Sequence, residues 1–239
     1  MFQAEQNQKI LMLLTALDAE LLSRCSFVFG GGARIVLELD EFRDSRGITL
    51  VCSDAEGFSD LRYAVASLGY DALFKAEARK GLHLSHEIRF NPFGIRFPVG
   101  IGGTEIPVEL RREARIELDP GVRPPWSPVD CLSIADCFAE KLLANSDRRT
   151  DRQELSRDLI DLSALRGRIG PIPEEAWYKV DDAYRAAGRD ALLKALLAFL
   201  EDEPHQQRCF KGLNIEAPAE ILAGVSQLLM DLEAPSQAS

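Results

Sequence analysis

The spacing of apolar residues predicts alternating helices and strands in the first part of the chain. In residues 5–23, apolar side chains such as Ile10 and Leu14 recur at helical spacing, which predicts one helix. Residues 27–29 form a short apolar segment that leads into three glycines, and residues 35–39 predict a short helix after them. The apolar run at 48–52 is typical of a buried strand, and it is followed by a predicted helix at 61–68 that ends at a glycine.

Residues 73–118 change to a β pattern. Three segments, 88–90, 95–97 and 106–110, alternate apolar residues with polar or small ones, as strands with one buried face do. An Asn-Pro-Phe-Gly sequence and a glycine-rich stretch lie between them and supply the residues that tight turns require. The pattern predicts consecutive strands joined by short turns.

A proline-rich stretch separates this half from a helical one. Residues 119–128 contain four prolines, and we take this stretch as a domain boundary, with an α/β domain at 1–125 and a helical domain at 129–239. Apolar residues then recur at helical spacing in five segments, 134–144, 155–165, 174–187, 191–200 and 217–232. The predicted fold class is therefore α/β (α+β), a mixed sheet with flanking helices followed by a helical bundle.

The glycines Gly30, Gly31 and Gly32 are a candidate phosphate site, because they lie between a predicted strand and a predicted helix. In such a turn, backbone N–H groups approach a phosphate closely, and the start of the helix adds positive potential. Three glycines are also common in an ordinary tight turn. The P-loop sequence Gly-Lys-Ser/Thr and the spaced glycines of dinucleotide sites are both missing from the sequence.

The segment at 29–54 resembles the AbiEii/AbiGii family of nucleotidyltransferase-like toxins, a branch of the polymerase-beta-like nucleotidyltransferase superfamily. Members read Gly-Gly-Thr or Gly-Gly-Gly, then a short helix, then Arg-x-Ser-x-Asp-Ile-Asp on the next strand. Five residues match this pattern here: Gly30, Gly31, Arg43, Ser45 and Ile48. The resemblance implies a nucleotidyltransferase-like sheet, with the glycines, Arg43 and Ser45 at the nucleotide.

The chain departs from the family at the two aspartates, whose places hold Gly47 and Thr49. Aspartates at i and i+2 of a strand point to one face, and in the family they hold the metal ions that bridge the nucleotide phosphates. Glycine offers no ligand, and a threonine hydroxyl is a poor replacement for a carboxylate. The family's Mg²⁺ site is therefore expected to be impaired. Glu109 is the candidate for a third carboxylate, although an exposed strand glutamate is the commoner role.

The helical half carries a second resemblance to the same family. Residues 132–144 resemble its helix with a Glu-Lys-Leu-x-Ala core, and Arg148 and residues 156–162 resemble its Arg and Arg-Asp-x-x-Asp-Leu elements. The resemblance implies that Lys141 lines a cleft and binds phosphates. Asp158 and Asp161 share a helical face, so they would hold Lys141 and Arg148 in place or act on the acceptor. From the residues alone, the alternating charges of this stretch favour a solvated helix face.

Composition limits the classes of partner. The net charge is −10, which repels bare nucleic acid unless positive charge is gathered in one place. The five cysteines form no Cys-x-x-Cys pair, and the closest histidines, His83 and His86, lie in an extended stretch, so we expect a reduced cytoplasmic protein without a zinc site. The N-terminus has no signal-peptide pattern, and the apolar run at 10–14 is too short to span a membrane.

Three functions follow from these observations. The resemblance implies transfer of a nucleotide from an NTP to an acceptor such as RNA, opposed by a cognate antitoxin. The lost aspartates favour an alternative, a catalytically inactive protein that binds nucleotide or a partner in a toxin–antitoxin-like system. A scaffold without a ligand is the third. The candidate catalytic residues are Glu109, Lys141, Asp158 and Asp161, and the candidate nucleotide-binding residues are Gly30, Gly31, Gly32, Arg43, Ser45, Lys141 and Arg148.

Overall fold

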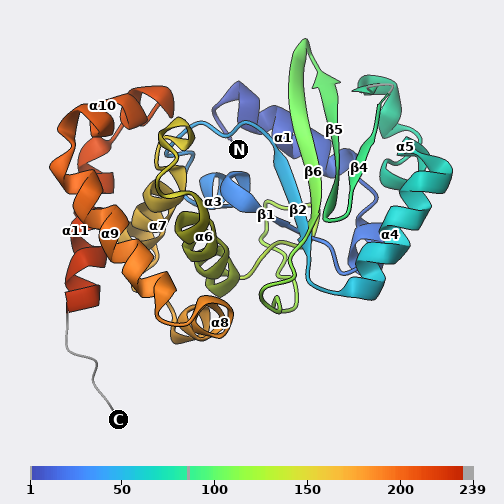
Figure 1. The fold of residues 1–239 in the computed structure, drawn as a ribbon. Helices are drawn as coiled ribbons and strands as arrows, with labels where there is room; N and C mark the ends of the chain where they lie inside the picture. Colours follow the sequence, from blue (N-terminus) through green and yellow to red (C-terminus); the bar gives the residue numbers. More distant parts are fainter. Residues whose placement is uncertain (1, 85–86, 234–239) are drawn as a thin grey trace. The chain divides into compact units, whose positions relative to one another are not determined.

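The chain forms two compact units in the computed structural model, which describes residues 2–84 and 87–233. The first unit consists of the residues up to Leu37 together with Ser45–Ser133, and the second consists of Glu38–Asp44 together with the residues from Ile134 on. Figure 1 shows a sheet with helices in the first unit and helices alone in the second. The segment at 38–44 thus leaves one unit and joins the other.

One mixed sheet of six strands forms the α/β unit in the part of the chain that the structure describes. Its strand order is β1-β2-β6-β5-β3, with β4 pairing β5. Only the β2–β6 pair is parallel among these described pairings, and the rest are antiparallel. The strands are β1 Val28–Gly30, β2 Ile48–Cys52, β3 His83–Leu84, β4 Arg89–Asn91, β5 Gly94–Ile101 and β6 Thr104–Arg112. This architecture confirms the predicted fold class.

The helices of this unit are α1 Glu5–Ala16, α2 Ala19–Arg24, α3 Gly31–Glu38, α4 Ala55–Leu68, α5 Tyr70–Leu73 and the 3₁₀ helix η1 Ala78–Gly81. The single helix predicted at 5–23 is wrong, because the chain breaks between α1 and α2. At the break, the Asp18 carboxylate accepts hydrogen bonds from the backbone N–H groups of Glu20 and Leu21, which caps α2. The backbone N–H of Asp18 itself donates to Leu73 O over 2.8 Å.

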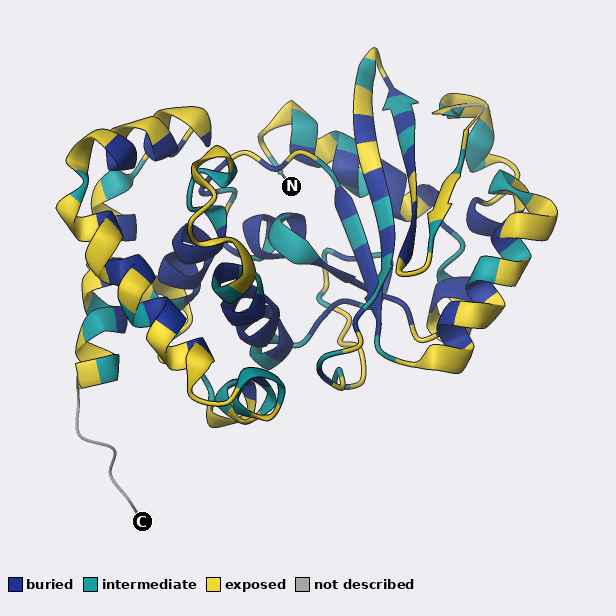
Figure 2. Cartoon of the chain, in the orientation of Figure 1, coloured by how far each residue is buried: buried dark blue, intermediate teal, exposed yellow. Residues whose placement is uncertain are grey.

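The core of the α/β unit lies between this sheet and helices α1 and α4. Ile10 and Leu14 of α1, Leu61 of α4 and Leu50 of β2 have no exposed surface. Figure 2 shows the same division, with buried residues on the inner strands and exposed residues on the outward helix faces. The helical period of α1 and the continuous apolar run of β2 therefore mark surfaces that are buried.

The helical unit contains α6 Ile134–Arg148, α7 Arg157–Arg168, α8 Glu174–Tyr184, α9 Ala187–Glu201, α10 Glu203–Gly212, α11 Pro218–Glu233 and the 3₁₀ helix η2 Arg152–Glu154. The predicted helix at 155–165 begins two residues later, because Leu155 and Ser156 have positive φ angles of 53° and 49°. Helix α10 was not predicted, and the Asp202 carboxylate caps it by accepting from the backbone N–H of His205.

The segment at 38–44 is held in the helical unit by backbone contacts. The backbone N–H of Asp44 donates to Leu213 O over 2.9 Å, and Arg168 Nη1 donates to Leu39 O over 2.5 Å. In the described residues, no helix combines the length and the apolar character that crossing a membrane requires. Of the two histidines considered for zinc, His83 lies in β3, as its extended pattern indicated, and His86 lies outside the described residues.

Candidate functional site

A row of register partners crosses the sheet at the positions that the sequence singled out. Gly30 of β1 pairs with Thr49 of β2, Thr49 pairs with Glu109 of β6, and Glu109 pairs with Arg96 of β5. Side chains at paired positions of neighbouring strands point to the same face. Thr49, Glu109 and Arg96 therefore share one face, which begins at the glycine turn.

The glycine turn lies directly against Thr49. Strand β1 ends at Gly30, and α3 begins at Gly31, whose φ of +68° favours glycine. A Cβ atom on Gly31 would lie 3.1 Å from both Cβ and Oγ1 of Thr49. The Thr49 side chain therefore faces the turn, and Gly32 follows in the first turn of α3.

Gly47 is enclosed by the neighbouring strand. A Cβ atom here would lie 2.5 Å from Pro107 O and 2.8 Å from Pro107 Cγ, closer than a real Cβ approaches another atom. The position lies just before β2, and the backbone of β6 fills the space that a side chain would need. The glycine is thus required by packing, and an aspartate cannot be placed here without moving β6.

Glu109 is already engaged by a cation. Arg96 donates from Nε and Nη2 to Glu109 Oε1 over 2.8 and 2.5 Å. The Glu109 side chain is 28% exposed and that of Arg96 is 62% exposed, so this pair adds little to stability. It does neutralise the one carboxylate that the sequence offered as a metal ligand on this face.

These residues do not fit the two-metal site of the family. Gly47 supplies no donor, Thr49 supplies a hydroxyl, and the Glu109 carboxylate faces a guanidinium. Within residues 2–84 and 87–233, no three histidine, cysteine, aspartate or glutamate side chains are grouped so that they could hold a metal ion. The donor set of this face is therefore unsuited to Mg²⁺.

A cluster of five charged side chains, four of them buried, lies in the helical unit. Lys141 Nζ pairs with Asp158 Oδ1 over 2.9 Å and with Asp161 Oδ2 over 2.6 Å. Arg43 holds Asp161 in a two-pronged contact, donating from Nε to Oδ1 over 2.7 Å and from Nη2 to Oδ2 over 2.8 Å. Arg148 Nε donates to Asp158 Oδ2 over 2.6 Å. Asp158 thus contacts Lys141 and Arg148, and Asp161 contacts Lys141 and Arg43.

The burial of this cluster governs its electrostatics. Burial alone would lower the pKa of Lys141, but Asp161 and Asp158 more than offset it, so the pKa is raised and the ammonium stays charged. Burial acts against ionisation of Asp158 too, yet Lys141 and Arg148 hold the pKa of Asp158 well below its usual range. Three cations face two carboxylates, so the cluster as a whole is positive.

The structure thus brings Arg43, Lys141, Arg148, Asp158 and Asp161 together within the helical unit. The other candidates, Gly30, Gly31, Gly32, Ser45 and Glu109, belong to the α/β unit, where Ser45 is buried. Their roles stay predictions. Sequence reasoning missed Arg96, although the alternation at 95–97 placed it on the polar face of its strand.

Comparison with family models shows the family of this chain, and comparison with solved structures shows its fold. The model of the nucleotidyl transferase AbiEii toxin family, from type IV toxin–antitoxin systems, matches residues 13–214. No curated protein sequence matches the chain.

Two solved structures from Helicobacter pylori resemble the fold. One is a provisionally named nucleotidyltransferase, 13% identical, with a TM-score of 0.52 over 97% of this chain and 98% of that one. The other is JHP933, 15% identical, with a TM-score of 0.53 over 96% of this chain and 94% of that one.

Proposed function

We propose a function from the premise that this chain belongs to the nucleotidyltransferase AbiEii toxin family of type IV toxin–antitoxin systems. In our proposal the protein binds an NTP without depending on Mg²⁺, and its transfer of a nucleotide to an acceptor such as RNA is weak or absent. The single observation that carries the proposal is Gly47, because Pro107 fills the space that a metal-binding aspartate would occupy.

The cluster around Lys141 supports nucleotide binding. An ammonium has three N–H donors, and Asp158 and Asp161 account for two of those on Lys141. The third donor and the positive charge of the cluster suit an anionic phosphate. In this proposal Asp158 and Asp161 are positioning residues, since both oxygens of Asp161 are engaged and its side chain has no exposed surface.

The chemistry of transfer explains why activity would be weak. Phosphoryl transfer depends on cations that stabilise charge on the phosphate oxygens, and the family places metal ions there. Here that charge is left to Lys141, Arg43 and Arg148. Such a set holds a bound nucleotide, but nothing on the face around Thr49 activates an attacking hydroxyl, because Glu109 is paired with Arg96.

The test is calorimetric titration of the protein with each NTP, with and without Mg²⁺, together with a transfer assay that uses an α-labelled NTP and cellular RNA. We expect binding that is the same in both conditions and transfer near background. Robust Mg²⁺-dependent transfer would overturn the proposal, and absence of NTP binding in both conditions would favour a scaffold.

A matched pair of variants locates the nucleotide. Lys141→Met removes the buried ammonium, and Lys211→Met removes an exposed lysine from α10 of the same unit. We expect the first change to abolish NTP binding and the second to leave it unchanged. Equal affinities in the two variants would exclude Lys141 as a nucleotide contact.

The proposal extends to partners and location. The family supports a cognate antitoxin, whose co-expression should relieve any growth defect that this protein causes. All five cysteines are free and buried, which is consistent with a reducing, cytoplasmic environment.

A further inference from the structure

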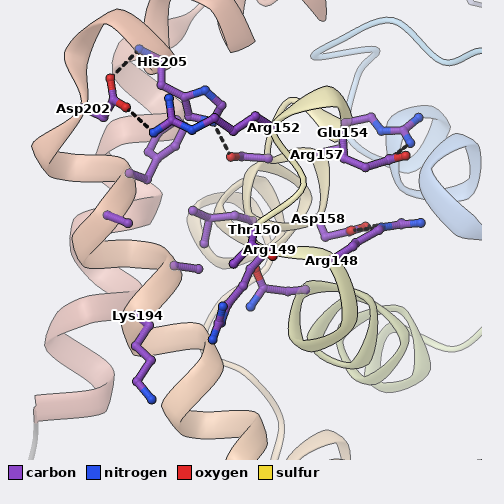
Figure 3. Close-up of a pocket in the computed structure, with 16 residues that line it drawn as sticks. Arg148, Arg149, Thr150, Arg152, Glu154, Arg157, Asp158, Lys194, Asp202 and His205 are labelled. Atoms are coloured by element: carbon purple, nitrogen blue, oxygen red, sulfur yellow. Dashed lines mark hydrogen bonds and ion pairs between the residues drawn. The ribbon is translucent and has the colours of Figure 1, made fainter.

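A second feature of the helical unit is a pocket of about 270 Å³ (Figure 3). It opens between the end of α6, the turn at 149–156, the start of α7, α9 and the start of α10. Pockets for drug-sized ligands span roughly 300–1,000 Å³, so this one suits a small group or one part of a larger ligand. The sequence had suggested a solvated helix face for this charged stretch, whereas the residues form a turn around the pocket.

The pocket carries an excess of positive charge. Five cations line it, and three of them have a carboxylate partner in its wall: Arg148 with Asp158, Arg152 with Asp202, and Arg157 with Glu154. The two others, Arg149 and Lys194, form no ion pair with any residue that the structure describes. Figure 3 shows their charged ends pointing to the same side of the pocket. This local excess is opposite in sign to the net charge of the whole chain, which is −10.

The frame of the pocket is fixed by polar contacts. Asp202 accepts from Arg152 Nη2 over 2.8 Å and from the backbone N–H of His205 over 2.9 Å. His205 Nε2 lies 2.9 Å from Ser156 Oγ. Leu155 and Ser156 have left-handed backbone angles, which cost energy and persist only where the surroundings hold them. Arg149 and Arg152 are therefore presented from a preorganised turn, and Lys194 is presented from α9.

The pKa shifts of Arg157 and His205 indicate a positive potential in the pocket, which favours an anion. Burial, and then the positive charges of Arg148 and Arg43, lower the pKa of Arg157. Burial and the nearby arginines also lower the pKa of His205, so this ring adds no charge at neutral pH. Asn145 lines the pocket as well, and its buried Nδ2 atom donates to no described residue.

We propose that this pocket binds a phosphate group, supplied either by the backbone of a nucleic-acid strand or by a free phosphate anion. Guanidinium groups match the geometry of phosphate oxygens, and a lysine adds a point charge. Arg149 and Lys194 form no ion pair with a described residue, so both are available to contact an incoming phosphate. This site adjoins the nucleotide site proposed at Lys141 and shares Arg148 and Asp158 with that cluster. The test changes neither shared residue, and it requires neither Mg²⁺ nor transfer activity.

The experiment compares two double variants with the same change of charge. Arg149→Gln with Lys194→Gln removes the two uncommitted cations of the pocket. Arg185→Gln with Lys211→Gln removes two exposed cations of the same unit, outside the pocket, that form no ion pair with described residues. Binding of a short fluorescein-labelled single-stranded RNA is measured by anisotropy at several salt concentrations, and binding of inorganic phosphate by calorimetry.

We expect the pocket variant to lose at least about tenfold in affinity for its ligand, and the control to lose about twofold or less. If RNA is the source, the slope of log affinity against log salt should also fall by about 0.7 for each phosphate that the variant no longer neutralises, with no binding of inorganic phosphate. If a free anion is the source, inorganic phosphate binds to the unmodified protein and the pocket variant binds it more weakly. Equal losses in the two variants, or no binding of either ligand to the unmodified protein, would overturn the proposal.

Discussion

The buried cluster in the helical unit predicts that two of its residues differ sharply in their effect on stability. Asp161 has no exposed surface and is the shared counter-ion of Arg43 and Lys141. Asp161→Asn removes the negative charge. It also places an amide NH₂ group, which is a donor, beside the N–H donors of Arg43 and Lys141. Lys141→Met removes a cation instead and places an apolar chain of similar length in the same space. The first change should destabilise the protein strongly and the second only slightly.

The expected change in the free energy of unfolding depends on which buried charges are left without a partner after each substitution. After Asp161→Asn, Arg43 and Lys141 are buried without their shared carboxylate, and breaking a buried pair in this way costs about 3–5 kcal/mol. After Lys141→Met, Asp161 keeps Arg43 and Asp158 keeps Arg148, so two balanced pairs are left. We expect that change to alter the free energy of unfolding by about 1 kcal/mol or less.

Urea unfolding measures this difference within the helical unit. In a Trp126→Phe background, Trp177 of α8 is the one tryptophan left, so its fluorescence follows this unit. With a slope of roughly 3 kcal/mol per M, Asp161→Asn should lower the urea midpoint by roughly 1–1.7 M. Equal shifts for Asp161→Asn and Lys141→Met, or a larger one for Lys141→Met, would refute the role of Asp161 as a shared counter-ion.

Three further outcomes are expected. Gly47→Asp should lower the melting temperature of the protein without creating Mg²⁺ affinity in calorimetry, because its side chain meets Pro107; gain of a tight Mg²⁺ site would contradict this. Burial and neighbouring arginines lower the pKa of His205, so the stability that its neutral form contributes is present above the unfolded pKa of about 6.5 and is lost as the pH falls below that value. His205→Gln should flatten the dependence of urea midpoints on pH between about 7.5 and 5.5. Gly224→Ala in α11 should cost about 1–3 kcal/mol, because its Cβ would lie 2.1 Å from a backbone oxygen of α7, whereas Gly167→Ala, with open space around it, should be neutral or stabilising in the same unfolding assay.

Elements with a strong local pattern were predictable from the sequence. The apolar run at 48–52 is β2, and the helix predicted up to Leu68 ends there because Gly69 adopts a φ of 60°. Helix α10 was missed because its residues, Glu203–Gly212, are mostly polar and include a proline in the first turn. The break at Asp18 was missed because part of what holds it is the Leu73 carbonyl, distant in sequence.

The candidate site was predictable only in part, for a physical reason. The family motifs singled out Arg43, Lys141 and Asp161, but no spacing rule connects Arg43 with a partner 118 residues later. The reason why position 47 holds a glycine could not be predicted from the sequence either, since it depends on Pro107 in the parallel neighbouring strand β6. Contacts between elements that are remote in sequence leave no periodic pattern, and only the folded chain shows them.

The segment at 38–44 has a consequence for synthesis of the protein. Because Arg43 belongs to the helical unit, the ribosome makes one member of this cluster 118 residues before its carboxylate partner Asp161. At about 5–20 residues per second, the delay is roughly 6–24 s. During that interval the guanidinium of Arg43 stays hydrated, while the rest of the first unit is completed. Translation speed between the two codons therefore sets how long the nascent chain waits before the helical unit can close around its charges.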